Sequence, residues 1–584
     1  MQEQAALEAA GLAEEQQKAQ ASMPDSTSAL FSASQGEEAL VTLKNELVEL
    51  QLSTKGGRIC KATLFEYDGL DGNPVVLFDK EDSRMNFSFT GKNENIRTEN
   101  LYFQPLGATD STVTMRLVAG ADRFIDFNYL LPGGQYLADL TIEAHGMDNF
   151  FTANTQNLNI DWYQRARQLE KGFSFEQRFA TLTYKEKGDD TDYLSETSEE
   201  TEEIAPAVDW IAFKNQFFSS VLIADQDFNK TTLSSVPQQE NSGYLKKYEA
   251  RMEAFFDPTG VQPTNLQLYF GPNHFKTLQA TNKLVHGGKD TELEDLVYLG
   301  WPLMRWINRW FTINVFDWLS GWGLNMGIVL LLMTIIVKII VYPTTYKSYM
   351  SSAKMRVLRP YVEEINKKYP NPEDAMKKQQ ETMALYSRYG VSPLGGCLPM
   401  LIQMPVYIAL FNFVPNAIEL RGESFLWAKD LSTYDDVINW DTNIWPLGDH
   451  LSLFCLLFSV TNILNTWYMM RQQKDAMAGQ QQMPGMKIMM YAMPIMFIFF
   501  LNDYSAGLNY YYFISGLISI LIMFVLRKAT DDKALLAKLE ARMEANKNKP
   551  RKMTGMMAKM EALQKQLEEQ QRLQQQQQQN RNKR

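Results

Sequence analysis

The chain has 584 residues and a net charge of −11, with 57 Lys and Arg against 68 Asp and Glu. This length exceeds that of one ordinary globular domain, so several units are expected. A mean hydropathy of −0.29 is typical of a soluble acidic protein, but the apolar runs after residue 321 exclude a wholly water-soluble surface. The odd number and wide spacing of the cysteines exclude a disulfide framework and a zinc-finger pattern, and the four isolated histidines predict no metal site. The cysteines are Cys60, Cys397 and Cys455.

Residues 1–37 predict a disordered or loosely helical leader. The stretch is rich in Ala, Glu, Gln and Ser, a composition that buries too little apolar surface to fold by itself. It predicts neither a signal sequence nor a membrane span.

Residues 38–290 alternate apolar and polar side chains with the period of two that is typical of β-strands. Clear runs are Thr112–Val118, Arg123–Tyr129 and Asn265–Phe270, and turn-forming residues such as Pro132-Gly133-Gly134 separate such runs. The segment therefore predicts a large antiparallel β-sandwich.

Residues 291–320 predict an amphipathic helix that lies along a membrane surface. Between Trp301 and Trp318, six aromatic side chains mix with Arg305 and Arg309, and tryptophan and arginine both favour the headgroup layer. The alternative that stays open is an ordinary packed helix.

Five apolar segments follow, and most approach the roughly twenty residues that cross a bilayer. They predict one span within residues 321–343 and four further spans within residues 392–528. The fourth segment is short and close to the fifth, so these two are expected to form a tight hairpin. The alternative is a buried helical core in a soluble protein, where such long apolar runs are rare. The segments are Trp322–Tyr342, Gly395–Val414, Leu447–Tyr468, Met486–Leu501 and Leu508–Leu526.

Charge predicts the orientation of these spans. Residues 344–391, which predict an amphipathic helical hairpin after Pro343, carry nine Lys and Arg. The loop 417–446 has only Arg421 and Lys429 against six acidic residues. The positive-inside rule therefore places the hairpin and the basic, Gln-rich tail 529–584 in the cytoplasm, and the β domain outside.

Several motifs and their order resemble the YidC insertases, a family with relatives in mitochondria and chloroplasts. The resemblance extends from the β domain to the last span. The motifs are Ser392–Pro399 running into Leu401–Pro405, Ala353–Arg356, Tyr342-Pro343, Lys487–Met489 with Met493-Pro494, and Gly507-Leu508 followed by Tyr511-Tyr512.

The resemblance implies a non-enzymatic protein of the bacterial inner membrane that inserts and folds other membrane proteins. It implies no catalytic residues, no cofactor and no metal. The expected partners are nascent membrane proteins, the lipid bilayer, the Sec translocon and, through the tail and the hairpin, the ribosome; DNA is not expected. The chain departs from the family in three respects: the family's usual first span is missing from residues 1–37, the tail is richer in glutamine, and Lys338 stands where the family usually has arginine.

Polar side chains within the apolar segments are the candidate substrate-groove residues. An insertase must lower the cost of moving polar groups through hydrocarbon, and the resemblance assigns the positions of Thr334, Lys338 and Tyr511-Tyr512 to such a groove. For the hydroxyls and amides, a helix–helix hydrogen bond is the alternative role. Lys338 is expected to be functional, because an ionised group inside a span is costly. The candidates are Thr334, Lys338, Gln403, Thr461, Asn465, Asn509, Tyr511, Tyr512 and Ser515.

Two other classes of function are weighed against this hypothesis. A solute transporter with an extracytoplasmic binding domain also carries polar residues in its spans, but it predicts repeated or interrupted spans, and the sequence shows neither. An envelope enzyme is compatible with a β-sandwich, but His145 and His274 lie far apart and no nucleophile motif accompanies them.

Overall fold

The computed structural model describes residues 28–92, 95–152, 155–371, 374–391, 398–444, 447–476 and 486–545. Most of the expected leader, the motif residues 392–397 and residues 546–584 of the expected tail lie outside these ranges.

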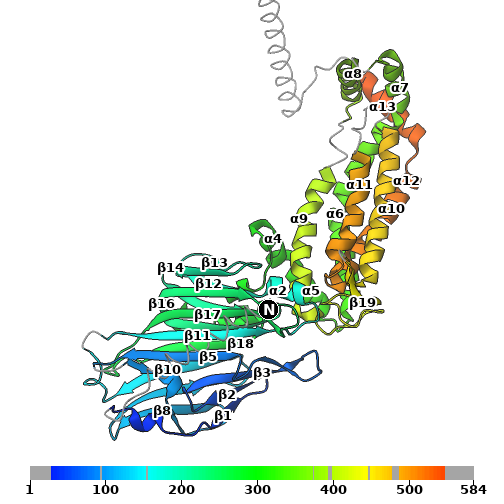
Figure 1. Ribbon diagram of the computed structural model, residues 1–584. Coiled ribbons are helices and arrows are strands. Elements are labelled where there is room, and N and C mark those ends of the chain that lie inside the picture. The colour runs from blue at the N-terminus through cyan, green and yellow to red at the C-terminus, as the bar shows by residue number, and fades with distance from the viewer. Residues whose placement is uncertain are drawn as a thin grey trace, which may run out of the picture. The chain divides into compact units, whose positions relative to one another are not determined.

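The first half of the chain is an antiparallel β domain (Figure 1). One sheet has the strand order β1-β2-β3-β4. A fourteen-stranded sheet follows the path β6-β5-β11-β17-β16-β18-β10-β9-β8-β7, with β12 to β15 attached beside it. The strands are β1 Leu40–Lys44, β2 Val48–Ser53, β3 Arg58–Asp68, β4 Pro74–Phe78, β5 Ser83–Thr90, β6 Asn95–Arg97, β7 Gln104–Leu106, β8 Thr112–Gly120, β9 Arg123–Leu130, β10 Leu137–His145, β11 Asn157–Arg167, β12 Thr181–Glu186, β13 Thr191–Tyr193, β14 Glu200–Ile204, β15 Val208–Lys214, β16 Phe218–Pro237, β17 Tyr244–Phe255 and β18 Thr264–Pro272.

The period of two in the sequence corresponds to one buried face on each strand. In β8, every second residue from Val113 to Ala119 is buried and its neighbours are partly exposed. Strand β15 is buried along its whole length, as expected for a strand covered on both faces. The predicted antiparallel β domain is therefore confirmed.

Strand β16 connects the two halves of the large sheet. Its first part, Phe218–Ala224, pairs with β18, and its later part, Asn229–Pro237, pairs with β17. The register shifts between Asn229 and Thr232, beside Lys230, which has a positive φ of 47°. Such a bulge bends a strand, so one strand serves both halves of the sheet.

Short helices connect the β domain to a longer helical run. The run from Pro302 to Ser320 is continuous, with one π-helical turn. Trp301, Trp306 and Trp310 are 75%, 62% and 71% exposed, which is consistent with the expected amphipathic character. The helices are η1 Phe31–Ser34, η2 Thr98–Asn100, α2 Phe173–Phe179, α3 Phe275–Asn282, η3 His286–Gly288, η4 Leu293–Leu296, α4 Pro302–Ile307, η5 Asn308–Thr312 and α5 Ile313–Ser320.

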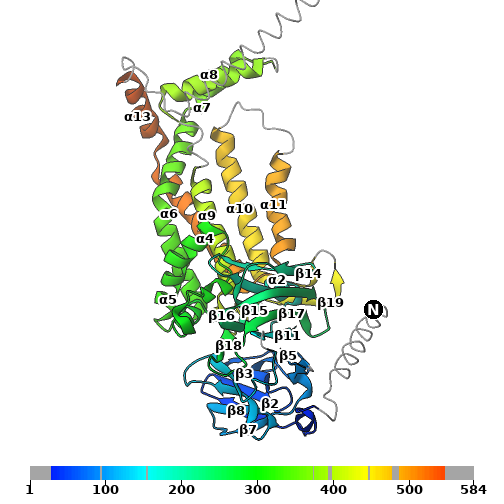
Figure 2. The same cartoon turned by 90° about the vertical axis from the view of Figure 1, so that its left-hand side faces the viewer.

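The apolar segments form five helices. All five are labelled in Figure 1, and Figure 2 shows α6, α9, α10 and α11 running alongside one another. Among the described residues, three helices are long and apolar enough to cross a membrane: α6, α10 and α12. Helices α9 and α11 have 16 residues each, and residues 392–397 and 477–485 next to them are not described. The helices are α6 Met326–Val357, α9 Leu398–Phe413, α10 Leu453–Ala476, α11 Met486–Leu501 and α12 Ala506–Ala529.

Two helix limits in this region differ from the ends of the apolar segments. Helix α6 continues through Pro343 to Val357, because neighbouring helices and side chains can compensate for the backbone hydrogen bond that a proline removes. The third apolar segment does not become helical at Leu447. Residues 448–451 instead form strand β20 (Gly448–Leu451), which pairs with β19 (Ile438–Ile444), and Asp435 accepts the backbone N–H groups of Leu453 and Phe454 at 2.9 and 3.1 Å, so the helix starts there.

Helices α7 (Arg359–Lys368), α8 (Ala375–Arg388) and α13 (Asp532–Ala545) belong to a second compact unit. Asp532 accepts a hydrogen bond from Arg356 at 2.8 Å, and Tyr361 donates to Glu540 at 2.7 Å. Leu539 is buried in the same apolar cluster as Val362. The first part of the expected tail is therefore a packed helix.

A buried ion pair fastens the loop after α9 to the β domain. Arg421 donates from Nε to Glu170 at 2.7 Å, and both side chains are 8% exposed. Arg421 also donates to the Asp68 carbonyl at 2.7 Å. Burial raises the pKa of Glu170 to about 7, although Arg421 opposes the shift. The pair therefore matters most when Glu170 is ionised.

We expect Arg421→Met to lower the free energy of unfolding by about 3–5 kcal/mol, because it leaves a buried carboxylate without its partner. The pKa of Glu170 in the fold lies above its ordinary value of 4.5, so the folded state holds the proton more tightly and stability falls as the pH rises from 4.5 to about 7. The deficit should therefore be larger at pH 8 than at pH 5 in thermal unfolding of the detergent-solubilised protein.

Two variants control this measurement. Glu170→Gln combined with Arg421→Met should recover most of the lost stability, because no charge is then buried. Lys230→Met removes an ion pair whose lysine side chain is 76% exposed and should change stability by less than about 1 kcal/mol. Equal effects of Arg421→Met and Lys230→Met would contradict a special role for the buried pair.

Candidate functional site

Lys338 lies in α6 with its side chain buried, at 6% exposure. Its Nζ donates to the hydroxyl of Tyr407 on α9 at 3.0 Å and to the hydroxyl of Ser519 on α12 at 2.8 Å. Nζ also lies 5.4 Å from the centroid of the Tyr407 ring. Helices α9 and α12 thus supply the groups that surround an ammonium carried by α6.

Further hydrogen bonds extend from Tyr407. Gln403 donates to its hydroxyl at 2.5 Å, and Ser515 Oγ lies 3.2 Å from the same oxygen. Ser519 donates to the Ser515 carbonyl at 2.8 Å. We call these five residues the polar cluster: Lys338, Gln403, Tyr407, Ser515 and Ser519.

Tyr407 and Ser519 are the members of the polar cluster that the sequence analysis missed. Tyr407 lies one helical turn after Gln403, and Ser519 lies one turn after Ser515, so each shares a helix face with a candidate that was named. This helical spacing is the sequence signal that could have identified Tyr407 and Ser519.

The other candidates on α6 and α10 have local contacts. Thr334 is fully buried and donates to the Leu330 carbonyl of its own helix at 2.7 Å. Thr461 is buried, and a Cβ added at Gly516 would lie 2.8 Å from its Cγ2, so it packs where α10 and α12 approach closely. Asn465 is partly exposed on α10. The structure does not bring these three side chains into hydrogen-bond contact with the polar cluster.

The candidates on α12 include buried polar side chains. Tyr512 donates to the Tyr407 carbonyl at 3.2 Å, beside the polar cluster. Asn509 donates to the Leu501 carbonyl at 3.0 Å. Within the described part of the chain, Asn509 Oδ1 is buried and finds no hydrogen-bond partner, and Tyr511 OH is buried near Ser515 of the polar cluster.

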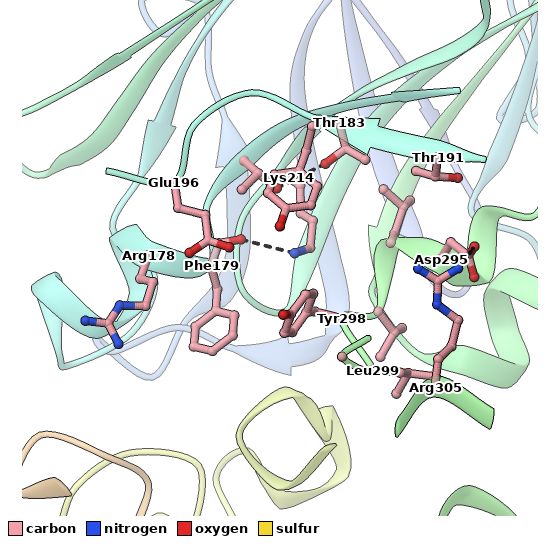
Figure 3. A pocket seen from close by; sticks show the side chains of 15 residues that line it. Arg178, Phe179, Thr183, Thr191, Glu196, Lys214, Asp295, Tyr298, Leu299 and Arg305 are labelled. Atoms are coloured by element: carbon pink, nitrogen blue, oxygen red, sulfur yellow. Dashed lines mark hydrogen bonds and ion pairs between the residues drawn. The ribbon is translucent and has the colours of Figure 1, made fainter. Parts of the chain in front are cut away.

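The β domain contains a small cavity of about 70 Å³ (Figure 3). Lys214 points into it and donates to the Phe179 carbonyl at 3.1 Å. The pKa of Lys214 is lowered to about 8, because burial lowers it, Glu196 partly opposes the shift and Lys246 adds to it. Pockets for small molecules usually measure about 300–1,000 Å³, so this cavity is small for a sugar.

Two family models together match most of the chain. A model described as the YidC periplasmic domain matches residues 40–313, and one described as 60Kd inner membrane protein matches residues 318–534.

Relatives named membrane protein insertase YidC are similar over most of their length. The relative from Phocaeicola vulgatus is 68% identical over 504 residues, which is 86% of this chain and 81% of the relative. The relative from Bacteroides fragilis is 58% identical over 561 residues, or 95% and 89% of the two chains. The relative from Porphyromonas gingivalis is 40% identical over 549 residues, or 92% and 86%.

Similar solved structures are more distant. A crystal structure of an active YidC insertase is 18% identical, with a TM-score of 0.33, over 84% of this chain and 93% of that chain. A galactose mutarotase related enzyme from Lactobacillus acidophilus is 9% identical, with a TM-score of 0.26, over 40% of this chain and 97% of that chain. On the strength of the family models and the close relatives, the chain belongs to the YidC family of membrane protein insertases.

Proposed function

We propose that this chain inserts and folds client proteins in the bacterial inner membrane by offering polar side chains at a depth where lipid offers none. The observation that carries the proposal is the buried ammonium of Lys338, held by Tyr407 and Ser519 from two other helices. The polar cluster, together with the buried polar side chains of Asn509 and Tyr511, supplies the polar lining of the proposed groove. The work needs no catalytic residue and no cofactor.

The physical basis is the cost of polar groups in hydrocarbon. A client must move charged or hydrogen-bonding groups through the bilayer, where each unsatisfied group costs several kcal/mol. A fixed cation attracts acidic groups of the client, and buried hydroxyl and amide groups can replace some of the hydrogen bonds that water provided. Thr334, Gln403, Thr461, Asn465, Tyr511 and Tyr512 complete the proposed groove.

The proposed topology has five spans, formed by α6, α9, α10, α11 and α12. The β domain, proposed to be a sandwich, and the loop 417–446 lie outside, while α7, α8 and the tail lie in the cytoplasm. The nine basic residues of 344–391 against two in the acidic loop support this orientation. The exposed tryptophans of α4 to α5 support contact of that run with the membrane surface.

The proposed partners follow from the same surfaces. Nascent membrane proteins are the clients, the Sec translocon supplies some of them, and the basic hairpin and tail contact the ribosome through its phosphates. Because helix α13 is packed, we propose that the ribosome contacts either the tail residues after α13 or the exposed face of α13.

We predict that Lys338→Arg is nearly neutral, that Lys338→Gln lowers insertion about tenfold for clients with acidic translocated segments, and that Lys338→Glu is worse. The reason is that a charge pair separated by about 8–16 Å at an effective dielectric constant of about 20 is worth roughly 1–2 kcal/mol. The measurement is insertion of one client carrying zero, one or two acidic residues into vesicles that contain each variant at equal amounts.

Three variants separate charge from hydrogen bonding. Tyr407→Phe and Ser519→Ala keep the ammonium but remove its partners, so they should affect all clients alike. Thr530→Val removes a hydroxyl that donates to the Leu526 carbonyl at the end of α12 and lies outside the proposed groove, so this variant should behave like the wild-type protein. Equal insertion by all Lys338 variants, or solute uptake by the same vesicles without insertion, would refute the proposed mechanism.

The orientation predicts opposite labelling of two exposed loop positions. With the native cysteines replaced by serine, Lys429→Cys should react with a membrane-impermeant maleimide added to cells whose outer membrane has been made permeable, and Lys367→Cys should not. Both positions are exposed, so burial does not limit the reaction. Disruption of the inner membrane should make Lys367→Cys reactive, and the reverse pattern in intact cells would overturn the topology.

A further inference from the structure

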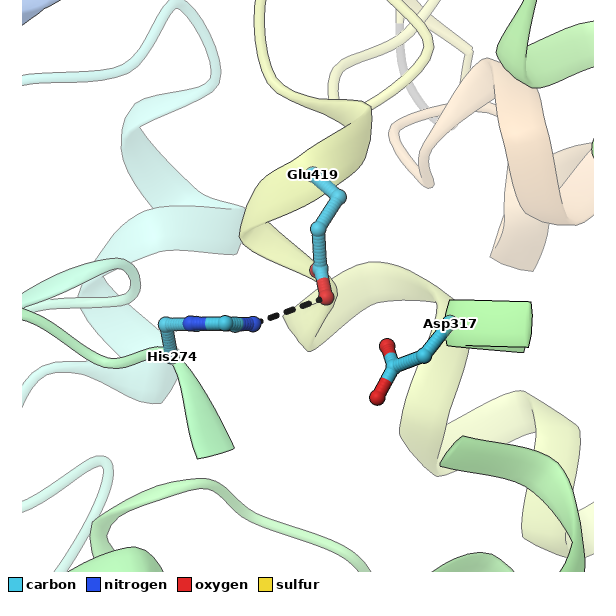
Figure 4. Close-up of side chains that lie close together, drawn as sticks. All are labelled: His274, Asp317 and Glu419. Carbon is cyan, nitrogen blue, oxygen red and sulfur yellow. Dashed lines mark ion pairs between the residues drawn. The ribbon is translucent and has the colours of Figure 1, made fainter. Parts of the chain in front are cut away.

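Three potential metal ligands lie close together beside the segment that follows strand β18 (Figure 4). His274 stands just before α3, Asp317 lies in α5, and Glu419 lies in η9 (Ile418–Leu420). One ligand atom from each residue lies within 4.8 Å of the others. His274 Nε2 is 3.3 Å from Glu419 Oε1, and Figure 4 shows the Asp317 carboxylate facing the same space.

A second contact orients the His274 ring. Its Nδ1 lies 2.8 Å from Thr277 Oγ1. In the tautomer whose Nδ1–H donates to Thr277, Nε2 presents its lone pair toward Glu419. A hydrogen bond from the other ring nitrogen is the usual support of a metal-binding histidine.

The surroundings favour a cation and leave a path for it. The side chains of His274, Glu419 and Asp317 are 29%, 24% and 17% exposed, so the space is connected to solvent. The carboxylates of Glu419 and Asp317 lie close to the His274 imidazole, so two negative charges face this space and attract a cation.

Lys276 is the competing cation. Its Nζ lies 2.6 Å from Asp317 Oδ2, and its side chain is 53% exposed. An exposed lysine in such a pair can turn into solvent at small cost, so it does not block the space.

We propose that His274, Asp317 and Glu419 bind a divalent transition-metal cation, with Zn²⁺ the best fit. One imidazole nitrogen and two carboxylate oxygens are zinc ligands, and three protein ligands leave a fourth position for water. The ion links α3, α5 and η9, which belong to three separate stretches of the chain. It thereby links the segment after strand β18 to helix α5 and to the loop after α9.

The test is zinc binding by the full-length protein in detergent, after chelator treatment, in competition with a chromophoric zinc chelator. One zinc per chain is expected for the wild-type protein. His274→Gln, Asp317→Asn and Glu419→Gln should each abolish it, and Thr277→Val should weaken it about 10–100-fold. Lys276→Met should bind zinc at least as tightly as the wild type, because the competing ammonium is gone.

The matched control is His286→Gln. His286 Nε2 lies 3.5 Å from Asp139 Oδ1, but no third ligand group joins this pair among the described residues, so this change should leave zinc binding intact. Thermal unfolding provides a second measurement. Zinc should raise the midpoint of the wild type and of His286→Gln, but not of the three ligand variants, whose midpoints without zinc show whether they fold.

Three outcomes would overturn the proposal. These are the absence of zinc binding at micromolar concentration, unchanged binding in the three ligand variants, and equal binding of Mg²⁺, which would be inconsistent with a site that uses imidazole.

Discussion

An ammonium group buried among apolar helices must be surrounded by acceptors, and this requirement organises the helical part of the structure. Desolvation of a charge is costly, so α6 can carry Lys338 only where Tyr407 and Ser519 meet its Nζ. Because one acceptor comes from α9 and the other from α12, the lysine fixes the rotation of three helices relative to one another. An apolar residue at the same position would not fix the rotation of the three helices in this way.

The polar cluster is only partly satisfied, and this has consequences for a client. An ammonium has three N–H donors, and among the described residues Nζ has two hydrogen-bond acceptors. Asn509 Oδ1 is buried without a partner among the described residues, and such a group costs about 1–3 kcal/mol. A polar group of a client that paired with Lys338 or Asn509 would recover part of this free energy, which is the physical basis of the proposed transient binding.

The sequence could predict features that depend on neighbouring residues, but not features that depend on residues far apart in the chain. The period of two predicted the β domain, because alternation directly reflects a strand with one buried face. Helix limits differ from the apolar runs at Pro343, where a long helix continues through the proline, and at Leu447, where the run contains strand β20. Tyr407 could not be identified from composition, since its role arises from the meeting of three helices. The grouping of His274, Asp317 and Glu419 could not be predicted for the same reason, since these residues are distant in the chain.

Several polar contacts hold the end of α9 from the side of the β domain. Asn308 donates to the Ala409 carbonyl at 2.8 Å, and Gln216 donates to the Pro415 carbonyl at 2.7 Å. Arg421 and Glu419, a few residues further on, contact Glu170 and His274. Tyr407 lies just two residues before Ala409, so it belongs to a helix end that η5 and the β domain both hold. A cation held by Glu419 would add one more link between the loop after α9 and the β domain. The β domain therefore helps to hold the helix that carries Tyr407.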